Sequence, residues 1–227
     1  MNRTILYLHG MGGGADSRIP GILQEHFAAA DPSVRVVCRT YDFDPAVAHP
    51  VIRGWIDELH PDLIIGESLG STHALRIPQI PKLLVSPALG GPLRLVRLAP
   101  WTRIPGVGWI CRRFIWRVKR PGRQVLRFRY RVLKNYREHY EEMVKLADDN
   151  RHARPDRASV LGPVHAFIGD IDHYKKSGVV SNALWEEFYG PGTLTTYPGT
   201  HFMEEEYIVH YLIPFINHYL SKYSTTH

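Results

Sequence analysis

A serine between two glycines gives the strongest chemical signal in this sequence. The pentapeptide GESLG, residues 66–70, follows an apolar run at 62–65 and precedes a short helical pattern at 69–75. A serine between a strand and a helix predicts a sharp turn, in which glycines on either side prevent Cβ clashes. Such a turn would expose the Ser68 hydroxyl as a nucleophile and point the helix N-terminus at developing negative charge. A turn that only connects two elements is the alternative.

A glycine-rich loop, HGMGGG at residues 9–14, follows the first apolar run of the chain. Glycines permit the loop geometry in which backbone N–H groups stabilise an oxyanion, and we predict the N–H groups of Met11 and Leu69 as the donors. We expect His9 to support this loop rather than to transfer protons. Glycine-rich loops also bind phosphates, but neither the P-loop lysine nor the G-x-G-x-x-G spacing is present.

Two aspartates compete for the role of the acid that orients a catalytic imidazole. Both lie in FIGDIDH, residues 167–173, at the end of an apolar run. We favour Asp172, three residues after Gly169, over Asp170. We expect the other aspartate to cap a turn or helix.

The predicted general base is His201, in YPGTHF at residues 197–202. It is one of 13 histidines, so residue type alone does not select it. Its position does, because it lies in a loop after the last apolar run and before the last helical pattern. His173, beside the predicted acid, is the second choice.

The elements that must position these residues alternate between strand and helix patterns. Strands are predicted at residues 4–8, 34–40, 62–66, 82–86, 164–169 and 193–197, and helices at 19–30, 50–59, 69–75, 177–189 and 204–219. Short strands separated by helices predict parallel pairing through crossovers. We therefore expect one α/β domain over residues 1–227, with a doubly wound, six-stranded, mainly parallel sheet.

A basic segment, residues 92–157, interrupts this alternation with 18 Lys and Arg against 6 Asp and Glu, in a chain of net charge +6. Residues 124–147 predict one amphipathic helix with an aromatic and aliphatic stripe, which includes Val125, Phe128 and Tyr136. We interpret the segment as a helical lid over the Ser68 pocket, because loops at the carboxyl ends of parallel strands border the ligand site. Its tryptophans and arginines also suit an anionic membrane surface or, less well, a nucleic acid.

Together HGMGGG, GESLG, GDID and GTHF, each after its own strand, resemble the α/β-hydrolase superfamily and its small bacterial esterase-like members. The resemblance covers nearly the whole chain outside residues 92–157. It implies a triad of Ser68, Asp172 and His201, in the chain order that this fold uses, and an acyl substrate. Glu67 beside the nucleophile departs from an ordinary site and is expected to disfavour anionic substrates.

The sequence thus predicts a serine hydrolase that cleaves a small carboxylic ester or thioester through an acyl-enzyme. The alternative is a non-catalytic protein of the same fold that holds an anionic partner or a membrane surface. We expect no cofactor and no metal site, because H-E-x-x-H and zinc-type cysteine spacing are absent and His165 with Asp172 lacks a third ligand. Without a signal peptide or a membrane-spanning run, and with Cys38 and Cys111 expected to be free thiols, a cytoplasmic location is predicted.

Overall fold

The computed structural model describes residues 2–111, 113, 122–152 and 160–223. Its central feature is a six-stranded sheet with the order β2-β1-β3-β4-β5-β6. The strands are β1 (Arg3–Leu8), β2 (Val34–Cys38), β3 (Leu63–Glu67), β4 (Lys82–Val85), β5 (Val164–Gly169) and β6 (Leu194–Tyr197). Every neighbouring pair is parallel, so the predicted fold class is confirmed.

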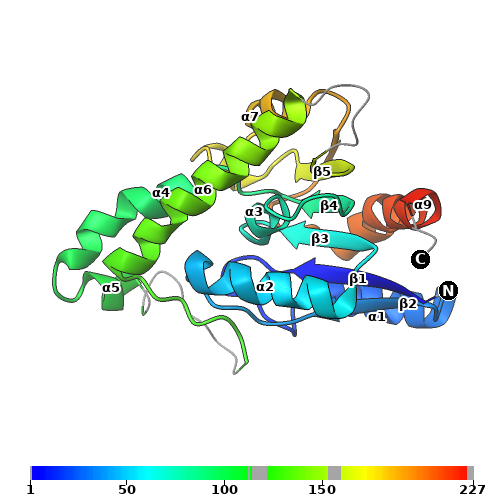
Figure 1. Ribbon diagram of the computed structural model, residues 1–227, viewed down its shortest axis with the longest axis horizontal. Helices are drawn as coiled ribbons and strands as arrows, with labels where there is room; N and C mark the ends of the chain where they lie inside the picture. Colours follow the sequence, from blue (N-terminus) through cyan, green and yellow to red (C-terminus); the bar gives the residue numbers. More distant parts are fainter. Residues whose placement is uncertain (1, 112, 114–121, 153–159, 224–227) are drawn as a thin grey trace.

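Helices cover both faces of this sheet (Figure 1), which explains why its central strands β3 and β4 are buried along most of their length. Alternate residues of β1 point to opposite faces: Ile5 and Tyr7 join one core, Leu6 and Leu8 the other. Helix α1 (Arg18–Ala30) and the C-terminal helix α9 (Ile213–Tyr223) complete the first core. The second core is completed by α2 (Pro45–Leu59), α3 (Gly70–Ala74), α6 (Tyr130–Arg151) and α7 (Asn182–Tyr189).

Several predicted helices differ in the structure. Helix α2 begins at Pro45 rather than at residue 50, because the Asp44 side chain accepts the Ala46 N–H and caps it while Pro50 lies inside the helix. Helix α7 begins at Asn182 rather than at 177, and a 3₁₀ turn, η3 (His173–Lys175), precedes it. The last helix is divided into α8 (Glu205–Tyr207), a π-helical turn η4 (Ile208–Leu212) and α9.

The basic segment contains α4 (Gly91–Leu98), the 3₁₀ turn η1 (Ala99–Arg103), α5 (Val107–Ile110) and α6. The predicted helix over 124–147 was wrong at its start, since α6 begins at Tyr130 and the preceding residues lie outside any helix. The residues before Tyr130 are bound to the glycine-rich loop instead, where the Gln124 N–H donates to the Gly13 carbonyl. Val125 is consequently 47% exposed and does not belong to the apolar stripe.

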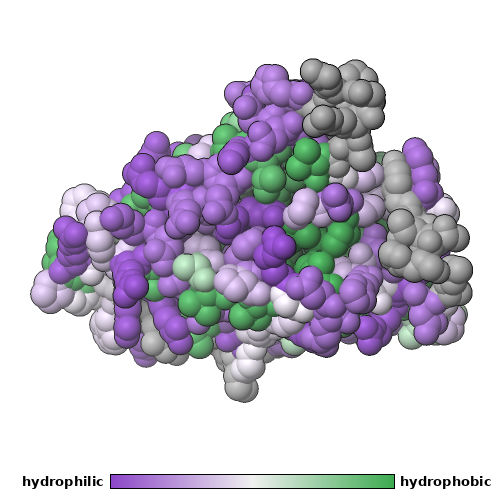
Figure 2. Space-filling model, in the orientation of Figure 1, coloured by the Kyte–Doolittle hydropathy of each residue, from purple (hydrophilic) through white to green (hydrophobic). Residues whose placement is uncertain are grey.

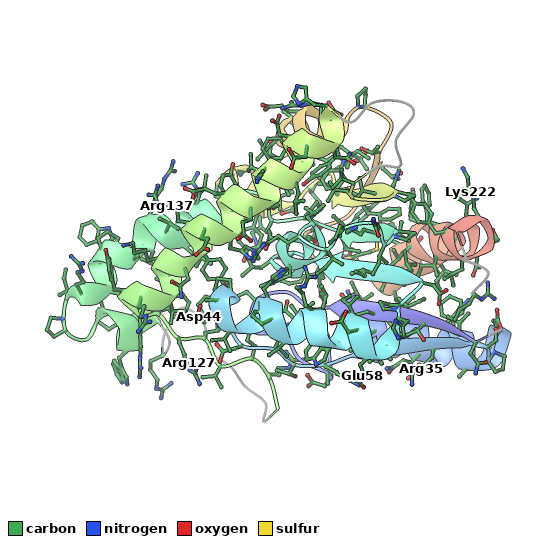
Figure 3. The ribbon with its side chains drawn as sticks, viewed as in Figure 1. Arg35, Asp44, Glu58, Arg127, Arg137 and Lys222 are labelled. Atoms are coloured by element: carbon green, nitrogen blue, oxygen red, sulfur yellow. The ribbon has the colours of Figure 1, made fainter. Side chains whose placement is uncertain are left out.

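Helix α6 packs along its length against the rest of the fold. Its buried side chains are Val132, Leu133, Tyr136, His139, Met143 and Ala147. Tyr136 lies with Phe43 and Phe128 in a third core, which joins the basic segment to the loop after β2. The outward surface over α6 is mainly hydrophilic (Figure 2), and Arg137 points away from the protein (Figure 3).

The other aromatic residues of the basic segment do not all turn inward. Trp101 is 63% exposed and Trp109 is 61% exposed, at the end of the molecule formed by η1 and α5. Phe114 and Trp116 lie outside the described residues. Phe128 and Tyr136 of the predicted stripe are therefore buried, whereas the two tryptophans are on the surface.

A buried hydrogen-bonded chain connects α6 to the turn that carries Ser68. Arg76 donates to Nδ1 of His139 at 2.7 Å, and His139 Nε2 lies 2.8 Å from the Thr72 hydroxyl. That hydroxyl donates to the carbonyl of Leu69. Because Nδ1 accepts from a cation, His139 fits here only as the neutral imidazole. Burial lowers the pKa of His139 below its usual 6.5 for the same reason.

We predict that the free energy of unfolding falls as the pH drops below about 6.5, because the unfolded chain then binds protons that buried histidines with a lowered pKa, His139 among them, do not bind in the folded state. For one such histidine, the free energy of unfolding falls by up to about 1.4 kcal/mol for each pH unit below the ordinary pKa, until the pKa of the folded state is reached. Urea unfolding between about pH 8 and pH 5 measures this. His139→Gln should flatten the profile, whereas His210→Gln, at an exposed histidine, should leave its slope unchanged. Equal slopes in all three proteins would contradict the assignment.

Candidate active site

Ser68 lies in a strained turn between β3 and α3. Its φ is 50°, in the left-handed region that favours glycine. The backbones around it are close: a Cβ on Gly66 would lie 2.7 Å from Ser71 Cα, and one on Gly70 would lie 2.2 Å from the Leu8 carbonyl oxygen. Gly66 therefore lets the end of β3 pack against the start of α3, and Gly70 lets the turn pack directly against the end of β1, as the motif predicts.

The structure brings Ser68, His201 and Asp172 together from three separate loops. His201 Nε2 lies 2.9 Å from the Ser68 hydroxyl oxygen, and His201 Nδ1 lies 2.8 Å from a carboxylate oxygen of Asp172. Both His201 and Asp172 are 3% exposed. A serine hydroxyl on an imidazole that a buried carboxylate orients is the arrangement that activated serine nucleophiles require.

The Asp172 carboxylate is held in its charged form. Burial by itself raises the pKa of this carboxyl. Hydrogen bonding and charge interaction with His201, together with the Tyr174 N–H that donates to it at 2.8 Å, outweigh that effect. The pKa of Asp172 therefore lies below its usual 3.8, and the carboxylate can stabilise a protonated His201.

The second-choice residues occupy different positions. Asp170 is exposed, and its N–H donates to the Tyr197 carbonyl. His173 is also exposed, with its ring centre 6.1 Å from that of His201. The Ile171 N–H donates to the Gly199 carbonyl, which ties the acid loop to the loop of His201.

The glycine-rich loop at residues 9–14 lies beside Ser68 and rests on His9. The His9 ring is buried, stacks on Tyr41 at 4.2 Å, and would meet any Cβ on Gly13 at 2.9 Å. Burial lowers its pKa from 6.5 to about 4, so the ring is neutral at ordinary pH. The ring supports the loop, and His201 occupies the position next to the serine.

The N–H groups of Met11 and Leu69 flank the site. Within the described part of the chain, neither donates to another protein group. The neighbouring Gly12 N–H is occupied, because it donates to the side chain of Gln124 at 3.0 Å. Gln124 thus fixes the loop from the basic segment while the two predicted oxyanion donors stay unpaired.

A cavity of about 400 Å³ opens in front of Ser68. Its wall is largely apolar, and the basic segment contributes Arg94 and Leu95 from α4 together with Arg123. Helix α6 does not line the cavity but packs behind it, against α2, α4 and α7.

Sequence reasoning missed several residues that border this cavity, namely Arg18, Arg94, Arg123 and Tyr174. It also missed Gln124, which binds the glycine-rich loop. A basic residue at the first position of α1, four residues after the glycine-rich loop, was the one available signal, for Arg18. The others become neighbours of Ser68 only through tertiary folding.

Solved structures with a similar fold share less than 20% of their sequence with this chain in each of three cases. Est1E from Butyrivibrio proteoclasticus is 17% identical with a TM-score of 0.59, over 97% of this chain and 89% of that one. Alpha/beta hydrolase domain-containing protein 10 from mouse is 14% identical with a TM-score of 0.59, over 96% and 90%. This chain has the α/β-hydrolase fold.

A third such structure is FphF, a fluorophosphonate-binding serine hydrolase from Staphylococcus aureus. It is 11% identical with a TM-score of 0.60, over 96% of this chain and 84% of that one. No protein-family model matches the sequence, and no curated protein matches it. The similarity to known proteins therefore rests on the fold and not on the sequence.

Metal-ligating side chains and cysteines were the other candidates for site chemistry. These contain no group of three or more His, Cys, Asp and Glu side chains placed to hold a metal ion. His165 instead bonds the Thr195 hydroxyl at 2.8 Å, and Cys38 and Cys111 are free thiols. None of the described helices is both long and apolar enough to cross a membrane.

We predict that Asp172→Asn lowers turnover of an ester by roughly 10⁴-fold, because the amide favours the imidazole tautomer that cannot accept the serine proton. Asp170→Asn is the matched control and should change turnover by less than about tenfold. Steady-state kinetics of both variants measures this. The assignment of the acid is wrong if the two effects are reversed.

Proposed function

We propose that this protein is a serine hydrolase that cleaves a small carboxylic ester or thioester through an acyl-enzyme on Ser68. One observation carries the proposal: a buried carboxylate, an imidazole and a serine hydroxyl are joined by contacts of 2.8 Å and 2.9 Å at the edge of a cavity. In this arrangement the Asp172 carboxylate orients His201, and His201 can accept the proton of the Ser68 hydroxyl.

In the proposed reaction, Ser68 Oγ attacks the substrate carbonyl carbon while His201 Nε2 takes the hydroxyl proton. The N–H groups of Met11 and Leu69 stabilise the oxyanion, and the Asp172 carboxylate stabilises the imidazolium. The intermediate expels the alcohol or thiol, which receives the proton from His201. Water, deprotonated by His201, then attacks the acyl-enzyme and releases the carboxylic acid with Ser68 restored.

The substrate class rests on the cavity and on the structural neighbours. A cavity of about 400 Å³ with a largely apolar wall suits a small molecule. Est1E has been solved with ferulic acid bound, and FphF is a fluorophosphonate-binding serine hydrolase solved with substrate. The ferulic acid bound to Est1E is a small carboxylic acid, which supports the same substrate class here.

A fluorophosphonate probe tests the proposal against the non-catalytic alternative. We expect the probe to label the wild-type protein at Ser68, detected by mass spectrometry of the labelled peptide, and to leave Ser68→Ala unlabelled. Ser177→Ala provides a control at a serine whose hydroxyl bonds a backbone carbonyl, and it should label normally. Failure of folded wild-type protein to react would favour the binding protein, with the basic segment as its contact surface.

We also propose that the basic segment acts as a lid through α4 rather than through α6. Leu95 of α4 lies on the cavity wall, whereas α6 contributes Met143 to the second core.

The exposed Trp101 and Trp109 fit a contact with an anionic membrane surface. A cytoplasmic location stays a prediction.

We predict that Leu95→Ala shifts ester preference toward longer acyl chains, because truncation enlarges the cavity next to Ser68. Leu98→Ala, also on α4 but not on the cavity wall, serves as the control. Nitrophenyl esters of increasing chain length give kcat/KM for each variant, with a change of about threefold to tenfold per pair of methylenes expected. An unchanged profile in Leu95→Ala would remove α4 from the acyl site.

A further inference from the structure

We infer that the substrate carries an anionic group, a carboxylate or a phosphate, which Arg18 and Arg94 bind at the mouth of the Ser68 cavity. The inference rests on the proposed function and names its substrate class. It starts from the cavity lining, in which three arginines, Arg18, Arg94 and Arg123, surround an otherwise mainly apolar wall.

Two of these arginines have no carboxylate partner within the described part of the chain. One nitrogen of Arg18 donates to the Met203 carbonyl, two residues past His201. One nitrogen of Arg94 donates to the Ser177 carbonyl, in the loop after the acid. A guanidinium has five N–H donors, so each keeps several for a ligand.

The third arginine differs, because Asp16 already neutralises it. Arg123 Nε lies 2.9 Å from the Asp16 carboxylate. Arg123 also pairs through its backbone with Gly14, so it holds the glycine-rich loop in place. The positive charge available to a ligand is therefore that of Arg18 and Arg94.

These two arginines reach the mouth from different elements. Arg18 is the first residue of α1, and Arg94 belongs to α4 of the basic segment. Each is tied to a loop that carries a member of the proposed triad, so both guanidinium groups are held near Ser68. Both side chains are exposed, which keeps them solvated until a ligand arrives.

Glu67 is an acidic residue of the same cavity lining. Its carboxylate lines the cavity but accepts a hydrogen bond from the buried Tyr7 hydroxyl at 2.7 Å. A hydrogen bond from Tyr7 fixes the position of this carboxylate but does not neutralise it, so the expectation that Glu67 disfavours anionic substrates stays a prediction, which the matched ester pairs test. The cavity thus presents an apolar wall, two arginines without a carboxylate partner among the described residues, and one carboxylate held by Tyr7. This lining suits an ester with an apolar part and an anionic end that lies at the arginines.

Matched ester pairs test the inference and distinguish where the anion lies. For an anion on the acyl side, mono-nitrophenyl suberate is compared with its methyl ester. For a carboxylate on the leaving group, 4-carboxyphenyl butyrate is compared with its methyl ester. For a phosphate on the leaving group, phenyl butyrate with a phosphate on the ring is compared with phenyl butyrate itself. In at least one pair we expect kcat/KM to favour the anion by about tenfold, and to lose that preference as salt rises.

Arg94→Gln and Arg18→Gln should each reduce the anionic-to-neutral ratio about threefold to tenfold, while Arg94→Lys should retain part of it. Arg137→Gln removes the same charge from an exposed site on α6 outside the cavity and should keep the wild-type ratio (Figure 3).

A ratio near one for every pair in a protein that hydrolyses neutral esters would overturn the inference and leave the proposed function standing. A ratio that falls equally in Arg137→Gln would also overturn it, because overall charge would then explain the preference. No hydrolysis of any ester, with no probe labelling of Ser68, would instead count against the proposed function itself.

Discussion

The conformation of Ser68 is the constraint on which the rest of the site depends. A φ of 50° is unfavourable for a residue with a Cβ, and it persists only because the surroundings over-determine it. The Ser68 N–H donates to the Val85 carbonyl of β4, and Gly70 packs against the backbone of β1. The sheet thus fixes the serine from both neighbouring strands, and the loops of His201 and Asp172 can meet it without moving.

The basic segment contributes more to this site than a covering role implies. Gln124 binds the Gly12 N–H of the glycine-rich loop, and His139 binds Thr72, whose hydroxyl in turn donates to the Leu69 carbonyl. Met11 and Leu69 are expected to supply the oxyanion donors. The basic segment therefore fixes the backbone at both, through Gly12 beside Met11 and through the carbonyl of Leu69. Oxyanion stabilisation depends on such rigidity, because donors that must reorganise lose much of their effect.

The sheet and the positions of the four motifs were predictable from sequence because each depends on local patterning: apolar strands, glycines and a serine at a turn. Asp172 was favoured over Asp170 from its position three residues after Gly169, and the structure places its carboxylate next to His201. The Ile171–Gly199 hydrogen bond that ties the two loops together is a contact that spacing does not encode. The start of α6 was missed because Val125 and Phe128 continue the helical spacing, while Gln124 is held by Gly13. Arg18 and Arg94 approach the cavity from separate helices, so no sequence window contains both.

The most direct measurement of the central claim is rapid-quench mass spectrometry during turnover of a nitrophenyl ester. The account predicts a burst of nitrophenol together with a peptide containing residue 68 that is heavier by the acyl group, and in Asp172→Asn the same adduct should form far more slowly. Nitrophenol release with the acyl group on another residue, or release without any covalent intermediate and unaffected by Ser68→Ala, would contradict it.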